Sequence, residues 1–157
     1  MSKLKTYWPE AAITAAVFAL DRISKILTLN LLAPKGSVEV LPFFRLSYVE
    51  NTGAAFGIFQ NGNTALAILS AAILVFLIAS RKEFLKLGGP ARYALIFIIA
   101  GAISNLYDRM ALGFVVDYFD FIVWPVFNIA DSFITTGAVI LGLLVILDFF
   151  RKKGEVK

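Results

Sequence analysis

The feature that most limits how this chain can fold is a series of long apolar runs separated by short charged segments. Of its 157 residues, 59% are hydrophobic and 17% are charged, and the mean hydropathy is +0.81. A soluble domain is usually about 45–50% apolar and about 25% charged. The sequence therefore predicts an integral membrane protein, and its length predicts a single domain covering residues 1–157.

Four apolar segments are candidates for membrane-spanning helices. They run approximately over residues 11–29, 64–80, 93–108 and 129–150. A spanning helix needs about 20 residues, with a tolerated range of about 17–25, so the third segment is short. The first segment carries charges in its second half and lacks the cleavage site of a signal peptide. We therefore predict an all-α membrane fold with four transmembrane helices.

The positions of the basic residues predict the orientation of these helices. Ten of the fifteen Lys and Arg residues lie in three short segments beside the apolar runs. They are Lys3, Lys5, Arg81, Lys82, Lys86, Arg92, Arg151, Lys152, Lys153 and Lys157. Cytoplasmic loops carry an excess of Lys and Arg, so both termini and the middle loop are expected in the cytoplasm. This clustering is not typical of a nucleic-acid-binding face, and no nucleic acid partner is predicted.

The two outer connections, residues 30–63 and 109–128, are then extracytoplasmic. Ser37 to Val49 is rich in β-branched and aromatic residues, so we predict a short strand pair on the membrane surface, broken at Pro42. Residues 51–62 contain small residues and glycines, which predicts a loop that approaches another group closely.

The absence of two residue types restricts the chemistry. The chain has no Cys and no His, which excludes thiol nucleophiles and His-based triads and removes the commonest zinc ligands. No metal or other cofactor is predicted. Enzyme chemistry would have to come from carboxylates, hydroxyls, lysines or backbone groups.

Polar residues are concentrated where the apolar segments meet the outer connections, although burying them near hydrocarbon is costly. They are Asp21, Arg22, Lys25, Asn51, Asn105, Asp108, Arg109, Asp117, Asp120, Asn128 and Asp131. Because polar residues in such places often serve function, this cluster is the candidate site.

Taken singly, these residues have structural explanations. The acid-first spacing of Asp21 and Lys25 predicts a neutralising i,i+4 pair. Neighbouring acidic and basic residues at the end of the third span suggest an ion pair, and the spacing of Asn128 and Asp131 is that of a helix N-cap with an acidic N3 residue. Asp117 and Asp120 resemble ordinary loop acids.

Taken together, Asp117 and Asp131 predict an acid–base pair. They are fourteen positions apart, with Trp124 and Pro125 between them, so the connection can fold back and bring them together. Two carboxylates that lie close together repel each other, so ionising both is unfavourable. The pair therefore retains one shared proton near neutrality. One can then activate water while the other protonates a carbonyl oxygen.

Five sequence blocks in this order make the chain resemble the lipoprotein signal peptidase family, also called signal peptidase II. The blocks are Asp21-Arg22-Ile23-Ser24-Lys25, Asn51-Thr52-Gly53-Ala54-Ala55-Phe56, the segment 101–109 (GAISNLYDR), Val115-Val116-Asp117-Tyr118 and Phe127-Asn128-Ile129-Ala130-Asp131-Ser132. The resemblance covers nearly the whole chain, and five ordered blocks are far more specific than any one.

The resemblance implies roles for particular residues. Asp117 and Asp131 would be the catalytic dyad of an aspartyl endopeptidase. The residues that bind substrate or support the dyad would be Asp21, Lys25, Asn51, Gly53, Asn105, Asp108, Arg109 and Asn128. The implied substrate is a prolipoprotein carrying diacylglycerol on its lipobox cysteine, cut on the N-terminal side of that cysteine. The implied setting is the cytoplasmic membrane of a bacterium, with a monomer sufficient for activity.

The sequence departs from the family pattern at two positions. Ser104 stands where glycine is common before the asparagine, and Arg22 stands where glutamine is frequent. The connection between the two aspartates is also short, which predicts a reduced flap there.

Two other classes of function fit a small membrane protein. In a secondary transporter, the intramembrane acids would bind protons or a cation, but transporters usually show repeated halves and acids at the midplane. A non-catalytic four-helix scaffold would leave the paired aspartates without a role.

Overall fold

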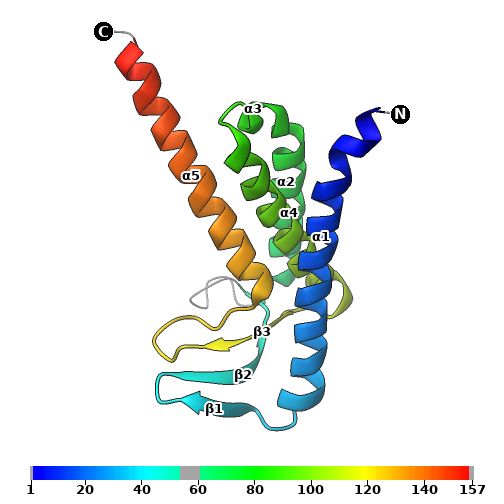
Figure 1. Ribbon diagram of the computed structural model, residues 1–157. Helices are drawn as coiled ribbons and strands as arrows, with labels where there is room; N and C mark the ends of the chain where they lie inside the picture. The colour runs from blue at the N-terminus through cyan, green and yellow to red at the C-terminus, as the bar shows by residue number, and fades with distance from the viewer. Residues whose placement is uncertain (1, 54–60, 156–157) are drawn as a thin grey trace.

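The computed structural model describes residues 2–53 and 61–155, and the predicted loop of residues 51–62 lies largely outside this range. The described chain is mostly helical. The helices are α1 (Ser2–Leu27) with its π-helical extension η1 (Thr28–Leu32), α2 (Asn63–Ala79), the short α3 (Arg81–Leu85), α4 (Gly89–Ala111) and α5 (Ile129–Glu155). α4 lies at the centre and packs against α1, α2 and α5 (Figure 1).

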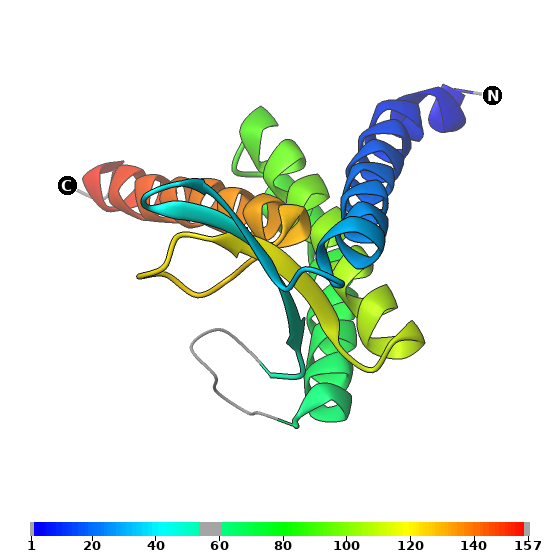
Figure 2. The ribbon, with the colours of Figure 1, turned by 90° about the horizontal axis from the view of Figure 1, so that it is seen from below.

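A three-stranded antiparallel sheet lies across one end of the helices (Figures 1 and 2). Its strands are β1 (Ser37–Leu41), β2 (Phe44–Asn51) and β3 (Val115–Asp120), in that spatial order. The strand pair predicted between the first two spans is therefore confirmed, and the turn contains Pro42 as expected. In the second ladder Val49 pairs with Asp117 and Asn51 pairs with Val115.

The third strand corrects the sequence prediction, which assigned no strand to residues 109–128. Every residue of β3 except Phe119 is buried, so the segment VVDYFD shows none of the alternation that marks a strand with one wet face. Asp120 is consequently not a loop acid. It lies at the end of β3, where its carboxylate accepts hydrogen bonds from Arg45, Ser47 and the backbone N–H of Ile122.

Two glycines allow α4 and α5 to approach each other closely. A Cβ on Gly101 would collide with the carbonyl oxygen of Ala130, and a Cβ on Gly137 would collide with that of Ala94. Farther from the sheet, the same helix pair contributes to an apolar core with α2. These contacts fix the beginning of α5, where Asp131 is located, against the middle of α4.

Within the described residues, two helices are long and apolar enough to cross a membrane, namely Gly89–Ala111 and Ile129–Gly154. α2 has 17 residues and is slightly too short for the same criterion, and the second half of α1 is charged. The four predicted segments lie in four separate helices, with α4 longer than expected. Four membrane spans remain a prediction.

Candidate active site

The two candidate catalytic aspartates come from different elements that meet at the sheet end of the helices. Asp117 lies in β3, and Asp131 lies in the first turn of α5. The backbone N–H of Asp131 donates to the Asn128 side-chain oxygen (2.8 Å), and the N–H of Asn128 donates to the Asp131 carboxylate (3.2 Å). This reciprocal pair is a capping box. The predicted cap is thus confirmed, and it also orients a candidate catalytic group.

Asparagine side chains hold the Asp117 carboxylate from two directions. Asn51 Nδ2 donates to one oxygen (2.8 Å), and Asn128 Nδ2 donates to the other (2.7 Å). The backbone N–H of Gly53 donates to the Asn51 side-chain oxygen (3.0 Å), so the NH₂ group of that amide is directed towards the aspartate. Asn128 therefore contacts both carboxylates, that of Asp117 through its side-chain NH₂ group and that of Asp131 through its backbone N–H.

A third asparagine holds Asp131. Asn105 Nδ2 donates to the Asp131 carboxylate (2.7 Å), while Asn105 Oδ1 accepts from Asn128 (3.2 Å) and from Lys25 Nζ (2.8 Å). A carboxamide oxygen cannot donate, so the Lys25 ammonium forces the NH₂ side of Asn105 to face the carboxylate. Lys25 thus acts on the aspartate through Asn105.

The Lys25 ammonium is buried and makes three polar contacts, which matches its three N–H donors. Besides Asn105 it contacts the carboxylates of Asp21 (2.9 Å) and Asp108 (2.7 Å). The predicted i,i+4 pair is confirmed, but it is one part of a larger cluster joining α1 to α4. Asp108 pairs with Lys25 and Arg22 rather than with its neighbour Arg109.

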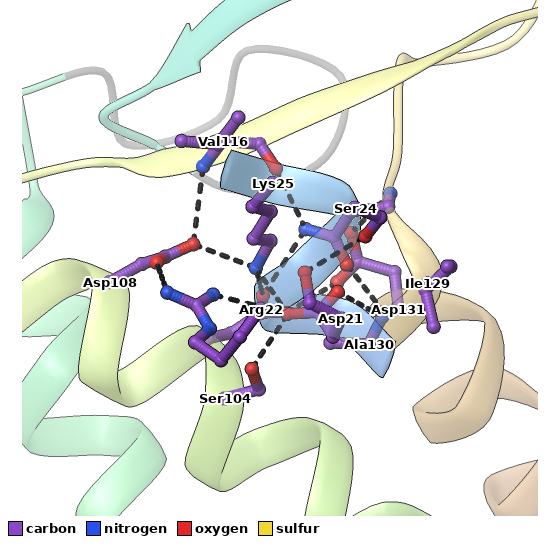
Figure 3. A network of polar contacts seen from close by, with 12 residues as sticks. Asp21, Arg22, Ser24, Lys25, Ser104, Asp108, Val116, Ile129, Ala130 and Asp131 are labelled. Atoms are coloured by element: carbon purple, nitrogen blue, oxygen red, sulfur yellow. Dashed lines mark hydrogen bonds and ion pairs between the residues drawn. The ribbon is translucent and has the colours of Figure 1, made fainter. Parts of the chain in front are cut away.

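The two residues that depart from the family pattern both belong to this cluster (Figure 3). Ser104 Oγ donates to Asp21 (2.6 Å), and Arg22 contacts the carboxylates of Asp21 and Asp108. With Arg22 the cluster holds two carboxylates and two cations and is electrically balanced. Ser104 and Arg22 therefore both bond to Asp21. Asp21 in turn accepts the backbone N–H of Ala130 at the start of α5 (2.9 Å).

Arg109 lies beside the aspartates without pairing to them. Its Nη2 donates to the Gly53 carbonyl (3.3 Å), whereas its buried Nε has no hydrogen-bond partner among the described residues. An unsatisfied buried donor at a cavity wall is costly unless a ligand or water completes it. Arg109 is therefore positioned to receive a hydrogen-bond acceptor.

These groups face a cavity of about 640 Å³ between α2, α4, α5 and the connection that follows β3. The predicted residues on its wall are Asn51, Asn105, Arg109, Asp117 and Asp131. Gly53, Asp108, Asn128, Asp21 and Lys25 do not line the cavity and lie behind these residues. Within the described part of the chain, no group of three or more carboxylate, Cys or His side chains is arranged to hold a metal ion.

The environment of Asp117 favours its protonated form. Burial, followed by the charge of nearby Asp131, raises the pKa of Asp117 to about 7, although the asparagine donors oppose the shift. Asp120 gives the contrast on the same strand. Its hydrogen bonds from Arg45, Ile122 and Ser47 outweigh the effect of its burial, so the pKa of Asp120 is lowered. Only the first of these carboxyls is suited to hold a proton near neutrality.

Some residues of the site were not predicted from the sequence. Ser132, Thr135 and Thr136 on α5 also line the cavity. Their spacing in an apolar helix is a recognisable signal, because polar residues in such helices usually face inward. Tyr118 and Ser24 were also missed as a pair: the Tyr118 hydroxyl donates to Ser24 (2.6 Å) and accepts the backbone N–H of Ile129 (3.3 Å).

Comparison with known proteins agrees with this geometry. Residues 13–147 match the protein family described as signal peptidase (SPase) II. A lipoprotein signal peptidase of Caldanaerobacter subterraneus is 46% identical over 136 residues, covering 85% of this chain and 93% of that protein. Another, from Clostridioides difficile, is 42% identical over 149 residues, covering 91% and 97%.

A solved structure is similar as well. It is described as a bacterial membrane enzyme determined by the in meso method at 2.3 Å resolution. The TM-score is 0.78 at 29% sequence identity, and the match covers 95% of this chain and 92% of that one. Fold and sequence together place the chain in the class of bacterial membrane proteases. It belongs to the signal peptidase II family, and the resemblance seen in the sequence is confirmed.

Proposed function

We propose that this protease is an aspartyl endopeptidase that removes the signal peptide from diacylglyceryl-modified bacterial prolipoproteins. It would cut on the N-terminal side of the lipidated cysteine, with Asp117 and Asp131 activating water. The observation that carries this proposal is the arrangement of two carboxyl groups on one cavity wall, each fixed by asparagine donors. The cavity faces no other acidic side chain among its described lining residues.

The mechanism follows from one proton shared by two carboxyl groups. The ionised group takes a proton from water as the water oxygen attacks the peptide carbonyl carbon. The protonated group gives its proton to the carbonyl oxygen, which yields a neutral tetrahedral intermediate. Collapse of the intermediate breaks the C–N bond, and the amine of the cysteine leaves with the proton that the dyad took from water. One hydroxyl of the intermediate returns its proton to the other carboxylate, so the new carboxyl group forms and the dyad again holds one proton. The Arg109 guanidinium, which lines the cavity, would bind a substrate carbonyl beside the cut.

The lipid on the substrate would set the register of cleavage. Each buried CH₂ contributes about 0.8 kcal/mol, so two acyl chains anchor the cysteine at a fixed depth better than peptide contacts could. The cavity joins the polar dyad to apolar residues on α2, α4 and α5, including Ile73, Ala102 and Ile134. This combination suits a peptide whose neighbouring cysteine carries lipid. The loop predicted over residues 51–62, expected to approach another group closely, falls mostly outside the described residues.

The proposed setting is a bilayer crossed by α1, α2, α4 and α5. Support for the first two comes from their surfaces. α1 buries Asp21 and Lys25 against the other helices while Leu20, Ile23 and Ile26 remain exposed. α2 exposes a similar apolar surface. Intramembrane charges that face the protein interior are compatible with a spanning helix, although they lower its average hydropathy.

The proposed orientation places the sheet and the dyad at the extracytoplasmic face. The far ends of α1 and α5 lie with α3 at the end opposite the sheet (Figure 1). The start of α1, the segment 81–92 and the basic residues 151–153 near the end of α5 belong to that end, as expected for the cytoplasmic side. We propose a monomer that acts on the prolipoprotein substrate within the membrane.

The deciding experiment compares one prolipoprotein with and without its diacylglyceryl group in the same detergent. We expect rapid cleavage of the lipidated form and a very low rate for the other. Asp117→Asn and Asp131→Asn should each reduce the rate by at least about 10²–10⁴-fold in folded protein. Asp120→Asn, on the same strand as Asp117, is the control and should keep most activity. Equal rates for the two substrates, or an active Asp131→Asn variant, would overturn the proposal.

A further inference from the structure

A second cavity lies at the other end of the helices, far from the dyad. It measures about 240 Å³ and is located between α1 and α4 beneath α3. Its walls are largely apolar, with Ala11, Leu95, Ile96 and Ile99 among the lining residues. Three charged side chains that contact one another also line it, Glu10, Arg81 and Arg92. The cavity is therefore amphipathic along its length.

Basic side chains outnumber acidic ones around this cavity. Glu10 accepts hydrogen bonds from Arg81 Nη2 (2.5 Å) and Arg92 Nε (2.6 Å), so one carboxylate faces two guanidinium groups. Both arginines are partly exposed, at 28% and 34%, and Glu10 is mostly covered. Lys82 and Lys86 belong to the same segment, where Glu83 is the single acid between residues 80 and 92.

The chemistry of the cavity selects its ligand. Paired guanidinium groups bind the oxygens of a phosphate in a fork geometry. A free phosphate ion would make no contact with the apolar walls. A lipid without net charge would not match the surplus of basic side chains. An anionic phospholipid satisfies both parts, and basic pockets between membrane helices on the cytoplasmic side are typical sites for such headgroups.

We propose that this cavity, defined by Glu10, Arg81, Arg92 and the apolar residues between α1 and α4, binds an anionic phospholipid of the cytoplasmic leaflet. The phosphate lies at the two arginines, and one acyl chain lies against Leu95, Ile96 and Ile99. The lipid then joins α1 to α4 at the end opposite the Asp21–Lys25–Asp108 cluster. Glu10 competes with the phosphate for the guanidinium groups. This proposal rests on the proposed membrane orientation and is independent of the dyad chemistry.

Because Glu10 competes with the phosphate, substituting Glu10 and substituting the arginines should change lipid binding in opposite directions. Purified full-length protein in neutral detergent is titrated with phosphatidylglycerol or with phosphatidylcholine, and bound lipid is counted by native mass spectrometry while Tm is recorded. Phosphatidylglycerol should bind and raise Tm, whereas phosphatidylcholine should do neither. Arg81→Gln and Arg92→Gln should each weaken binding by about fivefold, since one basic group near a membrane surface contributes about 1 kcal/mol. Glu10→Gln should strengthen it.

Arg151→Gln is the matched control, because Arg151 lies at the same end, outside the cavity, and pairs with Asp148. It should leave phosphatidylglycerol binding unchanged. If Arg151→Gln and Arg92→Gln weaken binding equally, the lipid responds only to diffuse charge and the proposal is wrong. It is equally wrong if Glu10→Gln and Arg92→Gln both lower Tm with no lipid selectivity, since the three residues would then be a structural clamp.

The two proposals fail separately in these assays. Asp117→Asn should bind phosphatidylglycerol as the wild type does while losing proteolysis. Loss of lipid selectivity with intact proteolysis overturns the lipid site alone. Intact lipid selectivity in a wild-type protein that cleaves no prolipoprotein overturns the proposed function alone.

Discussion

The two halves of α4 differ in what they bury. The half from Gly89 to Ala100 buries apolar side chains such as Ala94 and Leu95 in the core shared with α2 and α5. The half from Gly101 to Ala111 buries Ser104, Asn105 and Asp108, and each of these makes hydrogen bonds or ion pairs. One helix therefore belongs to an ordinary packed core at one end and to a polar network at the other.

This difference predicts how the two halves respond to change. Apolar packing is non-directional, so a substitution in the first half changes volume and stability without redirecting any catalytic group. Buried polar networks depend on direction, and removing one member leaves its partners unsatisfied. In the second half, stability and activity should therefore change together.

The largest effect is expected from Lys25→Met, which removes the ammonium that Asp21, Asn105 and Asp108 share. Breaking a buried ion pair from one side costs about 3–5 kcal/mol, so the free energy of unfolding should fall by that order. Activity should fall as well, because Asn105 loses the contact that sets its orientation towards Asp131. Chemical denaturation in detergent and a cleavage assay measure the two effects.

Lys152→Met is the control for this change. Lys152 is exposed near the end of α5 and pairs with Asp148, so its loss should alter stability by no more than about 0.5 kcal/mol. If Lys25→Met kept full stability and lost all activity, Lys25 would belong to the reacting groups instead of the supporting network.

The next effect is a loss of activity at high pH. Burial and the neighbouring Asp131 raise the pKa of Asp117 to about 7, so the proton that the proposed mechanism requires leaves as pH rises through that value. The rate should fall about tenfold per unit above pH 7, for one proton lost. A raised carboxyl pKa also makes folding most favourable at low pH, and this contribution is lost as pH rises from about 4 towards 7.

The pH dependence is measured as the initial rate between pH 5 and 9 in protein shown to stay folded. Asp120→Asn should have the same profile as the wild type, because the pKa of Asp120 is lowered and its carboxylate is ionised throughout this range. A rate that stays flat to pH 9 would contradict the shared-proton mechanism.

Short-range spacing predicted the local parts of this molecule correctly. The Asp21–Lys25 pair and the Asn128–Asp131 cap follow from intervals of four and three residues, and both are present. The strand pair between the first two spans follows from composition. These features depend on neighbours in the sequence, which makes them readable without a structure.

Long-range contacts were not readable in the same way. Tyr118 and Ser24 are 94 positions apart, and Arg45 and Asp120 are 75 apart, so no periodicity connects them. β3 was missed because it is covered on both faces and lacks alternation. Most buried groups of the site were predicted from the family blocks. The hydrogen bonds that connect them through Lys25 and Asn105 became visible only in the structure.

A smaller effect, on stability alone, is expected from Gly137→Ala. Gly137 lies on α5 and packs against the apolar half of α4. The new Cβ would meet the Ala94 carbonyl and Ile98, and overpacking of this kind costs about 1–3 kcal/mol. Gly142→Ala on the same helix is the control, because a Cβ there meets nothing within 4 Å. Thermal unfolding in detergent should separate the two variants. A Gly137→Ala enzyme that is stable but inactive would contradict the division between the halves.

The smallest effect is expected from Tyr118→Phe, which keeps the ring and removes one hydroxyl from the polar network. That hydroxyl donates to Ser24 on α1 and accepts the Ile129 N–H beside Asn128, so it ties β3 and the start of α5 to α1. Burial raises the pKa of Tyr118 to about 12, which keeps the hydroxyl protonated at every assay pH. Loss of a neutral hydrogen bond contributes about 0.5–1.5 kcal/mol.

If this small loss displaces the two aspartates relative to each other, it should appear in kcat more than in KM. We expect kcat to fall by up to about tenfold, which corresponds to about 1.4 kcal/mol, with KM little changed. Ser24→Ala should have a weaker effect, because the Ile129 N–H keeps its acceptor. Tyr93→Phe, at the apolar end of α4 where the side chain is 52% exposed, should match the wild type. Equal kcat values for Tyr118→Phe and Tyr93→Phe would show that the hydroxyl stabilises the fold without positioning the dyad, and the polar network would then end at Asn128.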